Sequence, residues 1–110
     1  MNRPMQITFR GMGPSEAMTE YIRGEAEKLE QFFDRIVGCH VVVEQPHRHQ
    51  RQGNHFHVRV ELHVPGRDII AGREHAERST HEDPYQAVSD AFEAARNQLQ
   101  HHADAQREHR

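Results

Sequence analysis

The chain has little of what a disulfide framework or a large aromatic core requires. Its 110 residues include one cysteine and no tryptophan, and aromatic residues make up 6% of the total. The single Cys39 cannot form an intramolecular disulfide, and it opens an apolar segment, so we interpret it as a small buried hydrophobe. Cysteine usage of this kind fits a reducing compartment, and we predict a cytoplasmic protein.

Long apolar runs and excess positive charge are also missing. No stretch approaches the roughly 20 apolar residues of a membrane span, and the first residues lack the apolar core of a signal peptide. The formal net charge is −3, whereas a general nucleic-acid binder is basic overall. Eleven histidines add positive charge only under mildly acidic conditions. The composition therefore predicts a soluble single domain without a membrane partner.

The clearest pattern occupies residues 55–64, where apolar and polar side chains alternate. The apolar set is Phe56, Val58, Val60, Leu62 and Val64, and the polar set is His55, His57, Arg59, Glu61 and His63. A period of two predicts a strand with one face buried and one face in water. Because the buried face needs a cover, helices are expected to pack on it.

Shorter patterns on both sides complete the order of elements. Strands are predicted over residues 5–9, 36–44 and 68–74, with a loop over 75–82. Helices are predicted from N-caps at Ser15 and Asp83, and Pro84 suits the first position of the second helix. The result is an α+β fold of order β-α-β-β-β-α, a two-layer sandwich in which two helices cover one face of a four-stranded mixed sheet. Residues 1–105 are expected to form the domain, and 106–110 a disordered tail.

Two segments carry sets of residues that look like family motifs. The first reads Lys28-Leu-Glu-Gln-Phe-Phe-Asp-Arg-Ile36, and the second reads Asp83-Pro-Tyr-Gln-Ala-Val88. On these residues the chain resembles the ribosome hibernation-promoting factors and ribosome-associated inhibitors, in their short form, over residues 5–105. The resemblance implies a double-stranded-RNA-binding-like fold, which agrees with the order of elements derived from the patterns.

The resemblance also implies a function. Such proteins bind the small ribosomal subunit in the channel for mRNA and tRNA and inhibit translation by occupancy, under stress or in stationary phase. The implied partner is the small subunit with its ribosomal RNA. No catalysis, cofactor, metal or small-molecule substrate is implied.

The RNA-binding residues that we predict are few, although the family carries clusters of lysine and arginine on both helices. RNA affinity comes largely from side chains that neutralise phosphates. Two positions of the first helix where basic residues are expected hold Thr19 and Glu25. A basic tip between the second and third strands can add phosphate contacts, although a solvated tip without a ligand is an alternative. The predicted residues are Arg23, Lys28, Arg96, His101 and His102 on the helices, and Arg48 and Arg51 at the tip.

A second function stays open because the sequence is rich in histidine. His47 with His49, and His55 with His57, are pairs that point to one side of an extended strand and suit zinc, copper or nickel. A third ligand is not in reach along a straight strand, so we predict no metal site. The alternative is a diverged member that no longer binds ribosomes and acts as a stress-related protein-interaction or histidine-mediated metal-binding module.

Overall fold

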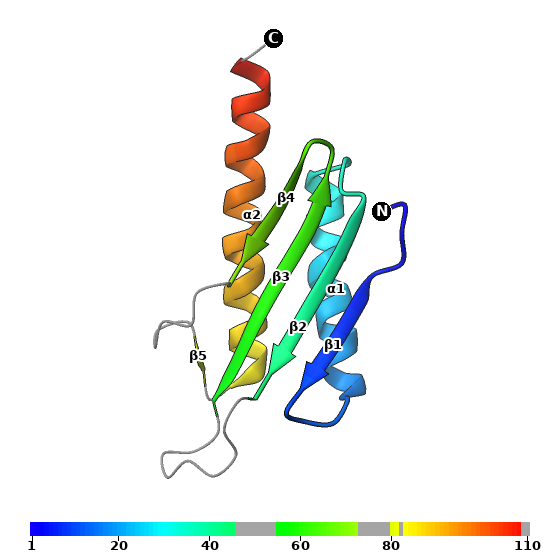
Figure 1. The fold of residues 1–110 in the computed structure, drawn as a ribbon, viewed down its shortest axis with the longest axis vertical. Coiled ribbons are helices and arrows are strands. Elements are labelled where there is room, and N and C mark those ends of the chain that lie inside the picture. Colours follow the sequence, from blue (N-terminus) through cyan, green and yellow to red (C-terminus); the bar gives the residue numbers. More distant parts are fainter. Residues whose placement is uncertain (46–54, 73–79, 82, 109–110) are drawn as a thin grey trace.

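The computed structural model describes residues 1–45, 55–72, 80–81 and 83–108. Its elements are β1 (Gln6–Arg10), α1 (Glu16–Phe32), β2 (Gly38–Glu44), β3 (Phe56–Val64), β4 (Arg67–Ala71), β5 (Thr80–His81) and α2 (Pro84–Glu108). Figure 1 shows this order along the chain. The predicted order is confirmed, with one addition, because β5 lies in a segment that we expected to be a loop.

The sheet is mixed, as predicted. Its strand order is β1-β2-β3-β4; β1 pairs with β2 in parallel, and β2 with β3 and β3 with β4 in antiparallel orientation. β4 pairs only with residues 60–64 of β3, and β5 pairs with Phe56 and His57. The short added strand therefore provides hydrogen-bond partners where β4 has ended.

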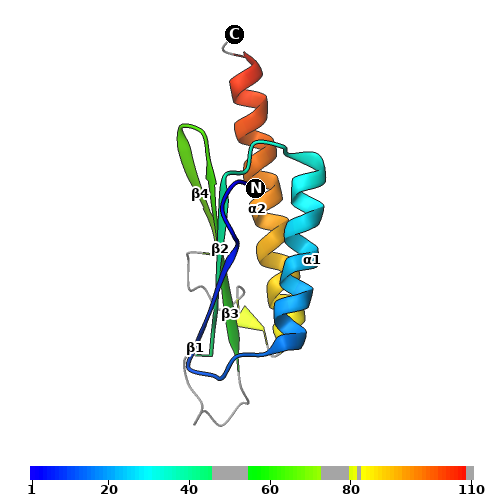
Figure 2. The ribbon, with the colours of Figure 1, turned by 90° about the vertical axis from the view of Figure 1, so that its right-hand side faces the viewer.

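Both helices pack on the same face of the sheet, as Figure 2 shows. The apolar side chains of β3 point into this layer, and Val60 and Leu62 have no exposed surface. The largest fully buried side chains of the core come from α1, the sheet and α2; they are Ile22, Leu62, Ile69, Val41, Val43, Val60 and Val88. The alternation in the sequence therefore identified the buried face correctly.

Local signals fix where each helix begins. The Ser15 hydroxyl accepts a hydrogen bond from the Met18 amide at 3.2 Å. The Asp83 carboxylate accepts one from the Tyr85 amide at 2.9 Å. Each bond satisfies an amide that has no partner inside its helix, so both predicted N-caps are confirmed.

Helix α2 continues to Glu108, which is three residues beyond the boundary predicted at residue 105. Asp104 holds the last turns together, because it accepts hydrogen bonds from Gln100, at 3.0 Å, and from Arg107. Side chains three and four positions apart face each other on a helix and stabilise it. The end of α2 projects past the sheet in both views (Figures 1 and 2).

The open face of the sheet is less exposed than the alternation predicts. His57 is only 4% exposed, because β2 and β5 flank it with Glu44 and Thr80 in register. The expectation of a fully solvated face was therefore wrong at this residue. The remaining polar side chains of β3 are half-buried and lie close to carboxylates: Arg59 Nε is 2.9 Å from Glu61, and His63 Nδ1 is 2.8 Å from Asp68.

Cys39 lies in the core and is 3% exposed. Burial in apolar surroundings, with a smaller effect of Glu30, raises the pKa of its thiol to about 12. The thiol therefore stays protonated at neutral pH, and the interpretation of Cys39 as a buried hydrophobe is confirmed.

Candidate nucleic-acid interface

The two basic side chains predicted on α1 are each close to a carboxylate of the same helix. Arg23 Nη1 is 3.4 Å from Glu20 Oε1, and Lys28 Nζ donates a hydrogen bond of 2.8 Å to Glu25 Oε2. The hydrogen bond and the charge of Glu25 raise the pKa of Lys28. Both cations are exposed, so these pairs stabilise the fold little. Their main effect is to offset the positive charge that a phosphate would meet.

The helices as a whole are acidic. Helix α1 carries five glutamates against Arg23 and Lys28, and α2 carries four carboxylates against Arg96 and Arg107. We call these two helices the acidic helix layer. Its charge is opposite to the one that the family resemblance predicts for an RNA-binding surface.

A tyrosine of the second sequence motif joins the two helices. The rings of Tyr21 and Tyr85 meet edge to face with centroids 5.2 Å apart. The Tyr21 hydroxyl and the Ser89 hydroxyl form a hydrogen bond of 2.6 Å. Aromatic pairs in this arrangement contribute to stability beyond the area that they bury. The role of Tyr85 in the motif is therefore to pack α2 against α1.

Of the basic residues predicted on α2, Arg96 lies at the middle of the helix, and His101 and His102 lie nearer its projecting end. The guanidinium carbon of Arg96 is 4.8 Å from the centroid of the Phe32 ring, which is a cation–π contact. His101 is exposed, and His102 is half-buried. Arg23 instead lies beside β1, where it lines a hollow with Ile7. The predicted residues therefore do not form a single cluster.

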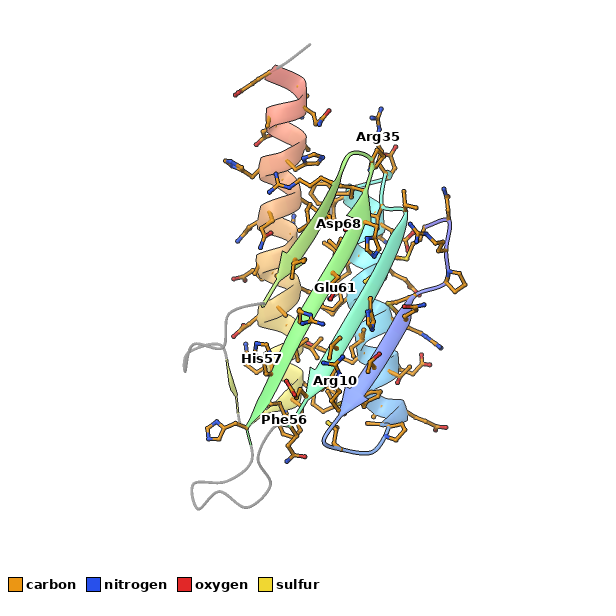
Figure 3. The ribbon with its side chains drawn as sticks, viewed as in Figure 1. Arg10, Arg35, Phe56, His57, Glu61 and Asp68 are labelled. Atoms are coloured by element: carbon orange, nitrogen blue, oxygen red, sulfur yellow. The ribbon has the colours of Figure 1, made fainter. Side chains whose placement is uncertain are left out.

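A groove of about 480 Å³ lies where α1 ends, between the β3–β4 turn and the last turns of α2. Apolar side chains and two arginines line it; the main ones are Phe32, Phe33, Arg35, Leu99, His102 and Arg107. Figure 3 shows Arg35 beside the β3–β4 turn, at the end of the molecule from which α2 projects.

The groove residues Arg35 and Arg107 were not among the RNA-binding residues predicted from the sequence. Arg35 belongs to the Asp-Arg-Ile end of the first motif, which was a usable signal, whereas Arg107 fell in the segment expected to be disordered. Arg48 and Arg51 lie outside the described residues, so their predicted RNA contacts stay predictions.

The described residues show no other kind of site. Among them, no three histidine, cysteine, aspartate or glutamate side chains gather to hold a metal ion. His47 and His49 lie outside the described part of the chain. None of the described helices is long and apolar enough to cross a membrane.

The chain is similar to hibernation factors over nearly its whole length. It is 29% identical over 106 residues to the ribosome hibernation promoting factor of Escherichia coli K12, covering 96% of this chain and 98% of that protein. It is 27% identical over 104 residues to the ribosome hibernation promoting factor of Azotobacter vinelandii, covering 93% and 86%.

Two solved structures share the fold. A ribosomal subunit interface protein from Coxiella burnetii superposes with a TM-score of 0.73 at 19% identity, covering 91% of this chain and 97% of that chain. The N-terminal domain of Thermus thermophilus Protein Y superposes with a TM-score of 0.68 at 17% identity, covering 90% and 96%. These likenesses confirm the two-layer α+β architecture.

A family assignment follows from the match along the chain. The family described as "Sigma 54 modulation protein / S30EA ribosomal protein" matches residues 5–107. Hibernation factors of this family act by binding ribosomes and not by catalysis, in agreement with the prediction that the chain is not an enzyme. The chain belongs to the Sigma 54 modulation protein / S30EA ribosomal protein family, which includes the ribosome hibernation promoting factors.

Proposed function

We propose that this protein is a translation inhibitor that binds the small ribosomal subunit in the channel for mRNA and tRNA during stress or stationary phase. The observation that carries the proposal is the match to a ribosome hibernation promoting factor that spans 96% of this chain and 98% of that relative. A match over nearly the full length of both chains supports a shared mode of action more strongly than a shared fold alone does.

The shape of the molecule supports inhibition by occupancy. The described body is elongated, with extents of 53 × 26 × 18 Å, and its two layers pack around one continuous core. A rigid body of this kind blocks a channel by its volume and needs no reactive group. Its ribosomal contacts then only have to hold it in place.

The charge of the acidic helix layer affects the affinity of the protein for ribosomal RNA. Attachment to RNA gains affinity from each phosphate that a lysine or arginine neutralises. Because Arg23 and Lys28 are offset by Glu20 and Glu25, we expect binding at neutral pH to be weak and to increase as histidines gain charge. His101 and His102 on α2 are the histidines predicted to contact RNA.

Co-sedimentation with purified small ribosomal subunits tests the proposal. We expect the protein in the subunit pellet at low salt, with more of it at about pH 6 than at about pH 7.5 because histidine is protonated over that range. Bound mRNA and tRNA should reduce the amount in the pellet if the three compete for the channel. Absence from the pellet at both pH values, at low and at moderate salt, would overturn the proposal.

The acidic helix layer is also the observation that favours the second candidate. A member that has lost ribosome binding would keep the fold and use its histidine-rich surface as a protein-interaction or metal-binding module. Calorimetric titration with zinc, copper and nickel separates the two. A saturable heat of metal binding without co-sedimentation favours the module. Co-sedimentation without a heat of metal binding favours the inhibitor.

A further inference from the structure

The groove beside the β3–β4 turn differs from the rest of the helical layer in its charge. Arg35 and Arg107 line it, and Asp34 is the one carboxylate among its described lining residues. Arg67 is in register with Val64, which lines the groove. Paired residues of an antiparallel ladder point to the same face, so the Arg67 side chain lies on the groove's side of the sheet.

Arg35 is available for a ligand. Its side chain is exposed, and it forms no hydrogen bond or ion pair with another described residue. Arg107 is held by Asp104, which fixes its position on the last turn of α2. Arg35 is therefore the arginine of the groove that no described carboxylate offsets, whereas Asp104 offsets the charge of Arg107 as Glu20 offsets that of Arg23.

Phe32 adds an aromatic surface to the same place. Its side chain is 65% exposed, the highest value among the exposed large hydrophobic residues of the described chain. Arg96 lies over one face of its ring at 4.8 Å, and the high exposure leaves the ring open elsewhere. We call this region the arginine end; it comprises Phe32, Arg35, Arg67, Arg96, His102 and Arg107.

These features match the chemistry of an unpaired nucleotide. Aromatic rings and guanidinium planes stack on bases that leave a helix, and arginines contact the neighbouring phosphates. Paired RNA keeps its bases inside the helix and offers no flat face to Phe32. The volume of about 480 Å³ lies within the range of small-molecule pockets, roughly 300–1,000 Å³.

We propose that the arginine end binds an unpaired nucleotide of RNA, with the base stacked on Phe32 in the groove and the flanking phosphates on Arg35 and Arg107. This inference rests on the proposed ribosome binding and names the RNA feature that the site recognises. It also gives the protein an RNA contact outside the part of α1 in which glutamates offset Arg23 and Lys28.

Binding of three short RNA hairpins tests the inference. One hairpin carries a single unpaired adenosine in its stem, the second is fully paired, and the third has an abasic site in place of the unpaired base. We expect fluorescence anisotropy to show about tenfold tighter binding of the first than of the other two, because stacking contributes most of the preference. Equal binding of all three, or no binding at low salt, overturns the inference.

Substitutions locate the contact. Phe32→Leu should abolish the preference for the unpaired base, and Arg35→Gln should weaken all three hairpins by about fivefold to tenfold. Arg10→Gln is the matched control, because it removes an exposed arginine from β1 outside the groove, and it should leave binding nearly unchanged. Thermal melting checks that the variants stay folded, as expected for exposed side chains.

Two further measurements separate the possible failures. If the natural chain co-sediments with small subunits but Phe32→Leu does so equally well and keeps the preference in hairpins, the nucleotide site is wrong and the proposed function stands. If the natural chain does not co-sediment, the proposed function fails independently of the hairpins.

Tighter binding of a Glu- and Leu-rich peptide than of the unpaired-base hairpin also overturns the inference, in favour of an acidic protein partner.

Discussion

The acidic helix layer and the arginine end use the same helices for different tasks. Along most of α1 the cations Arg23 and Lys28 stand next to glutamates, and Tyr21 joins α1 to α2. Where α1 ends, the Phe32 ring stands exposed at an apolar groove that Arg35 also lines.

The comparison shows that the fold of this family can be retained while the charged residues on its surface change. Core side chains such as Leu29, near the end of α1, and Ile36, just before β2, hold these segments in place. Their packing does not depend on the charges of exposed residues. Exposed ion pairs contribute little to stability. Charges on the helices are therefore free to change, provided that some other surface supplies the contacts that binding needs.

The largest effect is expected from reversing charge on the acidic helix layer. Glu20→Lys together with Glu27→Lys replaces two exposed glutamates of α1 and removes the partner of Arg23. We expect affinity for small ribosomal subunits to rise by about 100-fold at fixed salt, with a steeper salt dependence. Sedimentation across a salt series measures both.

The double variant Glu20→Gln with Glu27→Gln is the control for this reversal. It removes the same negative charges without adding positive ones, so it should give a smaller increase in affinity. If neither double variant changes affinity, the helix layer does not face RNA in the complex, and the arginine end carries the contacts.

A smaller effect is expected at the contact between the helices. Tyr21→Phe removes the hydrogen bond to Ser89 and keeps the ring against Tyr85. We expect the free energy of unfolding to fall by about 0.5–1.5 kcal/mol, measured by urea denaturation, with ribosome binding unchanged. Ser89→Ala should give a similar loss and the double variant no further loss. A change in binding without a change in stability would place Tyr21 in the interface.

The smallest effect is expected at Lys28, although it belongs to the first family motif. Glu25 raises the pKa of Lys28, so the ammonium stays charged up to alkaline pH and its contribution disappears only as the pH rises past the ordinary lysine range. Because the pair is exposed and already neutral overall, Lys28→Gln should leave ribosome binding within twofold of the natural chain at about pH 7. A drop of more than tenfold would show that Lys28 exchanges Glu25 for a phosphate in the complex.

The fold was predictable because its signals are local. Alternation from Phe56 to Val64 identified the buried face of β3, and Ser15 and Asp83 marked the helix starts before any tertiary contact was known. Each of these signals depends on residues within a few positions of one another. The family motifs agree with the arrangement of layers derived from these patterns, and two solved structures share it.

The candidate site was less predictable because it depends on contacts between distant segments. The groove joins Phe32 and Arg35 to Leu99 and Arg107, and no local pattern links those positions. Burial of His57 likewise depends on the added strand β5 as well as on β2. Sequence patterns describe the faces of single elements, whereas a groove is a property of the place where several elements end.

The parallel pairing of β1 with β2 has a consequence for how the molecule folds and opens. β2, β3 and β4 are consecutive antiparallel neighbours, whereas β1 reaches β2 only across the whole of α1. Closing that long loop costs more chain entropy before the first contact forms. β1 is also an edge strand, although the terminal amine of Met1 is anchored to Glu30 at 2.6 Å. We therefore expect β1 to join β2 after β2, β3 and β4 have paired, and its amide protons to exchange with solvent earlier than those of the central strands β2 and β3.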